Sequence, residues 1–182
     1  MDSAEFAREI RKARSPDDRI AWFGALLARE ARKDVEVVGG SAIEVYLSSA
    51  VYVSQDVDLV GDRTAIEAVL ARWGFRQVEG RSRRTYWTNE LVGLVDIVGP
   101  VDRSGLPPRE IATPHGPVTL SAPEPLIIRR LIRSNRENSK VLFSQAVALA
   151  RMGNLDWEYL ESEARYEKVE PRLKRLRQSL HP

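Results

Sequence analysis

The chain has 182 residues, with 28 Lys and Arg, 26 Asp and Glu, two His and no Cys, a length that suits one domain or a domain with a helical appendage. The lack of Cys and the two His exclude disulfides, thiolate metal sites, Cys nucleophiles and multi-histidine zinc sites, so any metal must be a hard ion held by carboxylates. The sequence lacks an apolar run of the roughly 20 residues that a membrane span needs and lacks an apolar leader, which predicts a cytoplasmic protein with no membrane partner.

Hydrophobic periodicity predicts alternating helices and strands over the first two thirds of the chain. In chain order these are a helix at 4–13, a helix from the Ser15-Pro16 cap, a strand at 35–38, a helix from Ser41, a strand at 56–60, a helix from the Asp62 cap to Gly74, and strands at 75–78, 85–88, 94–98 and 118–120. The segment 99–117, rich in Pro and Gly, is predicted to be mostly loop. Helical patterns follow at about 123–134, 138–151 and 155–180.

This order predicts an α/β (α+β) core at residues 1–122, with a small mixed sheet, followed by a helical C-terminal region at 123–182. The core carries 16 basic and 18 acidic side chains, a net charge of −2, and the C-terminal region 12 and 8, a net charge of +4. A basic region beside an acidic body would suit a polyanionic partner. On charge alone, a solvated helical surface explains the asymmetry better.

Three acidic residues interrupt strand patterns. Asp56 and Asp58 are two positions apart, so their side chains share one face of a strand, about 7 Å apart along the backbone. Asp96 lies inside an apolar strand, where an unpaired carboxylate would be costly. If the two strands pair, the three carboxylates converge, and their repulsion would favour a divalent cation with oxygen ligands, Mg²⁺ or Mn²⁺.

A glycine turn joins the strand at 35–38 to the helix that follows it. Gly39 and Gly40 let the backbone approach a ligand, and the helix that begins at Ser41 offers free N–H groups to an anion. The spacing is neither the GxGxxG dinucleotide pattern nor a P-loop, because no third Gly and no Gly-Lys-Ser/Thr follows. Alone, the turn is weak evidence of phosphate binding.

Taken together, these residues resemble a known family. The string VGGS at 38–41, the run DVDL at 56–59 and the later Asp96 are similar to the motif of the DNA polymerase β superfamily of nucleotidyltransferases. The DVDL run and the helix opening APEPL at 122–126 look most like the small bacterial and archaeal toxin nucleotidyltransferases of the abortive-infection type. The resemblance covers about residues 33–145.

The resemblance implies a nucleotidyltransferase fold and a Mg²⁺- or Mn²⁺-dependent transfer of NMP from an NTP such as ATP to an acceptor hydroxyl, with release of pyrophosphate. The residues that it assigns are Asp56, Asp58 and Asp96 to metal binding and catalysis, and Gly39, Gly40 and Ser41 to nucleotide binding. Asp96 also becomes the candidate acceptor of the hydroxyl proton.

Each feature has a plainer interpretation. The paired acids could deter pairing at a sheet edge, the glycines could form an ordinary turn, and Asp96 could belong to a buried ion pair. Their coincidence in the expected order favours the nucleotidyltransferase. The alternative function is a catalytically silent module on the same fold, such as a toxin–antitoxin component with a protein partner.

Two groups of basic residues are candidates for phosphate or RNA contacts, although solvated surface is at least as good an explanation. They are Arg81, Arg83 and Arg84 in a predicted hairpin turn, and Arg129, Arg133 and Lys140, which fall on one stripe if a single helix carries them. Because a positively charged surface repels polycations, we expect the acceptor to be RNA, such as tRNA, rather than an aminoglycoside.

Overall fold

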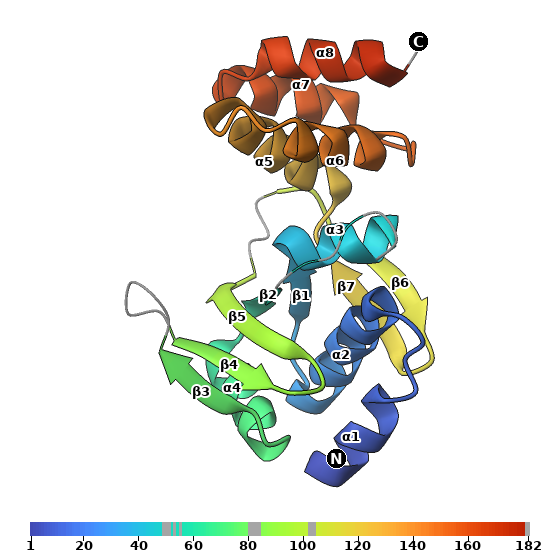
Figure 1. The fold of residues 1–182 in the computed structure, drawn as a ribbon, viewed down its shortest axis with the longest axis vertical. Coiled ribbons are helices and arrows are strands. Elements are labelled where there is room, and N and C mark those ends of the chain that lie inside the picture. Colours follow the sequence, from blue (N-terminus) through green and yellow to red (C-terminus); the bar gives the residue numbers. More distant parts are fainter. Residues whose placement is uncertain (49–51, 53, 55, 80–84, 102–104, 181–182) are drawn as a thin grey trace. The chain divides into compact units, whose positions relative to one another are not determined.

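The chain folds into two compact units, Met1–Ser121 and Ala122–Pro182. The computed structural model describes residues 1–48, 52, 54, 56–79, 85–101 and 105–180. The first unit combines helices with a sheet, and the second is helical (Figure 1). None of the described helices has both the length and the apolar character needed to cross a bilayer.

A mixed sheet forms the framework of the first unit. Its strands are β1 (Val35–Val38), β2 (Asp56–Gly61), β3 (Arg76–Glu79), β4 (Thr85–Asn89), β5 (Gly93–Gly99), β6 (Arg109–Thr113) and β7 (Gly116–Leu120). The described strands run in the order β3-β4-β5-β2-β1-β7-β6. The pairs β2–β5 and β1–β7 are parallel and the other pairs are antiparallel. The prediction of an α/β fold with a mixed sheet is confirmed.

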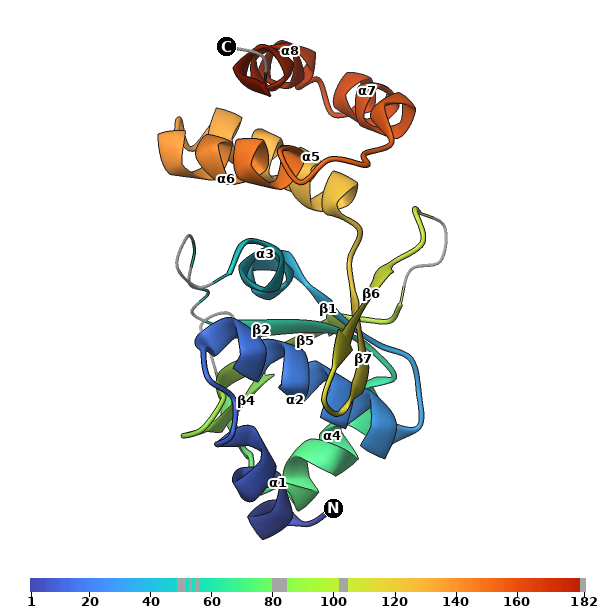
Figure 2. The ribbon, with the colours of Figure 1, turned by 90° about the vertical axis from the view of Figure 1, so that its right-hand side faces the viewer.

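Helices cover both sides of this sheet. They are α1 (Ser3–Ile10), α2 (Pro16–Ala31), α3 (Gly39–Leu47) and α4 (Arg63–Arg72). Figure 2 shows α1, α2 and α4 on one side and α3 on the other. Helices α2 and α4 start at their predicted caps: the side chain of Ser15 accepts the Asp18 N–H, and that of Asp62 accepts the Ala65 N–H. Helix α3, predicted to start at Ser41, starts two residues earlier.

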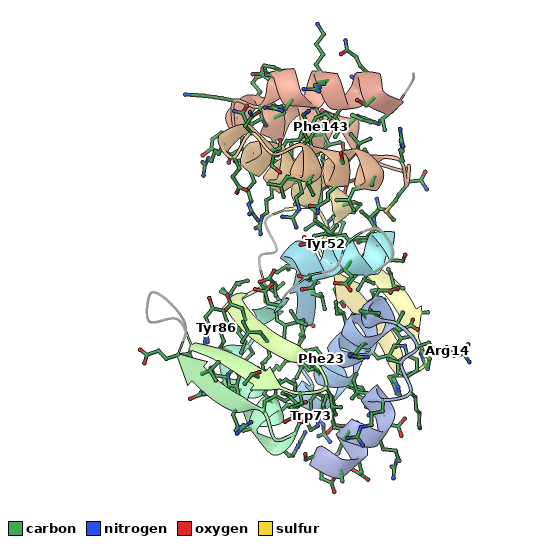
Figure 3. All side chains as sticks on the ribbon, in the orientation of Figure 1. Arg14, Phe23, Tyr52, Trp73, Tyr86 and Phe143 are labelled. Atoms are coloured by element: carbon green, nitrogen blue, oxygen red, sulfur yellow. The ribbon has the colours of Figure 1, made fainter. Side chains whose placement is uncertain are left out.

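The core of the first unit lies between the sheet and α2. Gly24 lets α2 come close to the sheet, because a Cβ atom there would lie 2.8 Å from methyl groups of Val37 and Val118. An aromatic cluster belongs to the same core. Phe6 stacks on Trp73 with ring centroids 4.3 Å apart. The ring centroids of Phe23 and Trp73, both labelled in Figure 3, are 6.2 Å apart. These residues come from α1, α2 and the end of α4, the helices on the side of the sheet opposite α3.

The prediction of mostly loop at 99–117 is wrong in part. Residues Arg109–Thr113 form β6, which pairs with β7 through a hairpin in which Thr113 lies opposite Gly116. Strand β6 is the last in the sheet, so it has a single neighbour and tolerates nearby prolines. Gly116 has a φ of 106°, which suits the tight turn.

The second unit contains four described helices. They are α5 (Pro123–Arg136), α6 (Lys140–Ala150), α7 (Trp157–Tyr166) and α8 (Glu170–Leu180). The single helix predicted over 155–180 is wrong. It is divided into α7 and α8, because Lys168 between them adopts a left-handed φ of 59°. Pro171 then lies in the first turn of α8, where its missing N–H costs nothing.

Candidate functional site

A glycine turn joins β1 directly to α3. Val38 is the N-cap of α3 and no side chain of its own caps the helix. Gly39 has a φ of 62°, and a Cβ atom there would lie 2.9 Å from Asp58 Cγ. The Gly40 N–H donates to Asp58 Oδ2 at 3.3 Å. The turn therefore needs glycine at position 39 on two grounds, the backbone angle and the close approach of the carboxylate.

The three predicted acids lie on one face of two paired strands. On β2, Asp56 and Asp58 are half-buried and alternate with the buried Val57 and Leu59. Strand β5 pairs with β2 in parallel, and the register sets Asp58 directly opposite Asp96, which is 7% exposed. Neighbouring strands lie about 4.8 Å apart. The strand pairing on which the three-acid hypothesis depends is present, and β2 and β5 bring these residues together.

The donor chemistry of this face suits a hard cation. Asp56, Asp58 and Asp96 offer only carboxylate oxygens, the ligands that Mg²⁺ and Mn²⁺ prefer. Within the part of the chain that the structure describes, however, no three His, Cys, Asp or Glu side chains are arranged as a ready-made metal site. One oxygen of Asp58 is instead directed to the Gly40 N–H. The residues fit the ion by type and by strand position.

Ser41 connects α3 to the backbone of β2. Its hydroxyl donates to the Asp56 carbonyl at 2.8 Å and accepts the Asp58 N–H at 2.9 Å. The residue is fully buried. Because the hydroxyl already donates one hydrogen bond and accepts another, the Ser41 side chain is bonded to the backbone of β2. The backbone N–H of Ser41 lies in the first turn of α3.

Glu44 is a buried acid that the sequence analysis did not select. It is 1% exposed; its Oε2 accepts the Ser54 N–H, and its Oε1 has no hydrogen-bond partner in the described structure. Burial raises the pKa of the Glu44 carboxyl above its usual 4.5, and the Ser54 N–H opposes this shift. With Arg19, Ser54 and Asp56 it lines a small pocket of about 80 Å³. The signal available was a single acid in an otherwise uncharged helix, GGSAIEVYL.

The basic candidates do not form the predicted stripe. Helix α5 ends at Arg136 and α6 begins at Lys140, so Lys140 belongs to a different helix from Arg129 and Arg133. The break occurs where Asn138 takes a φ of 47°. All three side chains are exposed.

Arg133 also has a local partner, because its Nε lies 3.0 Å from Glu137 Oε1. Exposed pairs of this kind contribute little to stability, but they reduce the charge offered to a ligand. The remaining candidates, Arg81, Arg83 and Arg84, lie outside the described residues.

Comparison with known proteins adds evidence on the fold. No model of a known protein family and no curated protein sequence matches the chain. Among solved structures, an antigenic nucleotidyltransferase-like protein from Paracoccidioides brasiliensis is similar, with a TM-score of 0.61 and 13% identity over 86% of this chain and 89% of that one. The chain has the nucleotidyltransferase fold.

Two structures of the antibiotic-resistance factor ANT(2'')-Ia are similar as well. A solution structure has a TM-score of 0.57 and 17% identity, covering 86% of this chain and 95% of that one. A crystal structure in complex with adenylyl-2''-tobramycin has a TM-score of 0.57 and 19% identity, covering 80% of this chain and 94% of that one. The predicted fold is confirmed, and at these identities the likeness concerns the fold.

Proposed function

We propose that this protein is an enzyme that transfers a nucleoside monophosphate from an NTP to an acceptor hydroxyl and releases pyrophosphate. The observation that carries the proposal is the register of β2 and β5. It sets Asp58 beside Asp96, while Asp58 also lies against the first turn of α3. One end of the sheet thus combines acids for a cation with a helix N-terminus for phosphates. The nucleotidyltransferase fold supports the same reaction.

The first turn of α3 would receive the phosphates. Its N-cap residue, Val38, offers no side-chain acceptor to the N–H groups of this turn, which carry the positive end of the helix dipole. Gly39 and Gly40 have no side chains to hold phosphate oxygens away from the backbone. Asp58, whose carboxylate now accepts the Gly40 N–H, lies where this phosphate subsite meets the acids.

The acids would hold the metal and handle the proton. Asp56, Asp58 and Asp96 would bind Mg²⁺, which when bound supplies the positive charge that stabilises the attacking and leaving oxygens. Asp96 accepts the proton of the acceptor hydroxyl. The hydroxyl oxygen forms a bond to the α-phosphorus as the bond from that phosphorus to the bridging oxygen breaks, and pyrophosphate leaves.

A transfer assay with NTP labelled at the α-phosphate tests this assignment. We expect Mg²⁺-dependent incorporation by the wild type and a loss on the order of 10²-fold or more in Asp58→Asn, which removes one preorganised charge from the site. Glu79→Gln is the matched control, since it neutralises an exposed acid on β3, which β4 separates from β5. Equal incorporation by wild type and Asp58→Asn would overturn the assignment of these residues.

Nucleotide binding separates this enzyme from a silent module on the same fold. A ligand that binds the folded state stabilises it by RT ln(1 + [L]/Kd), about 2.7 kcal/mol at a hundredfold excess over Kd. We therefore expect NTP with Mg²⁺ to raise the melting temperature. A flat response across the four NTPs would favour the silent module, such as a toxin–antitoxin component.

For the acceptor we propose RNA. The support is the net charge of +4 on residues 123–182 and the exposed basic side chains of α5 and α6. Binding that neutralises phosphates weakens with salt, by about 0.7 in log–log slope for each phosphate of a single strand. We expect tRNA affinity to fall at least tenfold between about 50 and 200 mM salt.

Labelling in a whole-cell extract provides the direct test of the acceptor. The ANT(2'')-Ia structure holds an adenylylated tobramycin, so the competing acceptor is a small hydroxylated molecule. RNase-sensitive label would support RNA. Label in a small molecule or in protein, together with tRNA binding that salt does not affect, would overturn it.

A further inference from the structure

The β2 segment that carries two of the acids extends beyond its neighbour β1. Pairing between β1 and β2 ends where Val38 lies opposite Asp58, because the chain then turns into α3. In a strand, the backbone groups of alternate residues face the same side. Among the described residues, β1 therefore has no partner for Asp56 on this side of β2.

Two side chains of α3 take the place of the missing strand. The Ser41 hydroxyl bonds both the Asp56 carbonyl and the Asp58 N–H. Glu44, three residues later and so on the same side of the helix, accepts the Ser54 N–H through Oε2. Backbone groups of three alternate residues, 54, 56 and 58, are thus all bonded to one helix.

The burial of Glu44 is not explained by stability alone. The side chain is 1% exposed, and Oε1 finds no hydrogen-bond partner in the described structure. A buried polar atom without a partner is destabilising, so such groups are rare and call for an explanation. Glu44 also lines a small pocket together with Ser54 and Asp56.

We propose that Ser41 and Glu44 are positioning residues that fix the backbone of β2 so that the carboxylates of Asp56 and Asp58 are held ready for the cation. We refer to these two residues as the α3 clamp. The inference rests on the proposed function, because it assigns the acids to metal binding. It assigns the Ser41 side chain to positioning β2 and not to phosphate binding. It assigns the same task to Glu44, which the sequence analysis did not select.

Amide hydrogen exchange on the full chain tests the clamp without reference to activity. Ser41→Ala removes both bonds to β2. Glu44→Leu removes the acceptor for Ser54, and Glu44→Gln retains an acceptor oxygen of similar reach. We expect the Asp58 amide to exchange faster in Ser41→Ala, and the Ser54 amide to exchange faster in Glu44→Leu but not in Glu44→Gln. Fast exchange at both amides in the wild type would overturn the clamp.

Mn²⁺ binding, followed by the electron paramagnetic resonance signal of the free ion, tests the positioning role. Replacing groups that orient metal ligands commonly costs 10–100-fold in affinity. We expect such a loss in Ser41→Ala and Glu44→Leu, with kcat falling more than the KM for NTP, and values within about threefold of wild type in Glu44→Gln. Tyr46→Phe is the matched control, because that hydroxyl of α3 donates to the Ser121 carbonyl.

The outcomes separate the clamp from the proposed function. Wild-type Mn²⁺ affinity in both Ser41→Ala and Glu44→Leu would overturn the clamp and leave the metal assignment standing. Equal impairment of Glu44→Gln and Glu44→Leu would also overturn it, because the negative charge and not the hydrogen bond would then be responsible. A wild-type protein that neither binds Mn²⁺ nor transfers label would overturn the proposed function and the positioning role together.

Discussion

Replacing Gly39 with alanine separates the cost of backbone strain from the cost to the site. A residue with a side chain pays about 1–2 kcal/mol to hold the left-handed angle that Gly39 adopts, with a φ of 62°. The added Cβ would also overlap Asp58 Oδ2 and lie 3.2 Å from Asp58 Cβ. Rotation of the carboxylate relieves the first contact and breaks the bond to the Gly40 N–H. The second contact requires the backbone to shift by a few tenths of an ångström.

Backbone strain at position 39 lowers stability, and the displacement of Asp58 lowers activity. We expect Gly39→Ala to lower the free energy of unfolding by about 1–3 kcal/mol in chemical denaturation, and to lower NMP transfer on the order of 10²-fold because Asp58 is displaced. Gly116→Ala is the matched control: its φ of 106° is also positive, but its Cβ would meet nothing within 4 Å. It should lose stability and retain transfer. Full transfer by Gly39→Ala would refute the role of this turn.

Three further outcomes follow from the packing and the pKa shifts. Phe6→Ala should lower the free energy of unfolding by about 3–5 kcal/mol in denaturant titrations, because it removes a fully buried ring stacked on Trp73. Because the pKa of Glu44 is raised in the folded state, its contribution to stability is present below pH 4.5 and is lost as pH rises through the folded pKa. Glu44→Gln should therefore gain stability relative to wild type over that window in urea melts, and a constant difference would contradict the shift. Burial beside Trp22 lowers the pKa of His115 below 6.5, so stability should fall as pH drops from 6.5 through the folded pKa, and an NMR titration midpoint at or above 6.5 would contradict this.

Strand positions of the acids could be predicted because side chains alternate along a strand. The pattern of Asp56 and Asp58 among apolar residues indicates one polar face, and it survives folding because Val57 and Leu59 are buried on the other. The helix starts at Ser15 and Asp62 were equally local, since each cap bonds an N–H three residues later. Such features depend on neighbours in sequence.

Features that depend on distant partners could not be predicted. The hydroxyl of Ser41 bonds residues 15 and 17 positions away, and only the placement of α3 against β2 shows this. Strand β6 was missed because it forms at the sheet edge beside β7, within a segment rich in proline. The break between α7 and α8, inside the single helix predicted over 155–180, depends on the left-handed angle at Lys168, which the helical periodicity does not reveal.

The position of the transferred phosphorus tests the central claim most directly. The protein is incubated with Mg²⁺, cell extract and NTP labelled either at the α- or at the γ-phosphate. We predict that α-label enters the acceptor, that γ-label leaves as pyrophosphate, and that both are lost in Asp58→Asn and Asp96→Asn. Transfer of the γ-label to the acceptor, or α-transfer that both variants retain, would contradict the account.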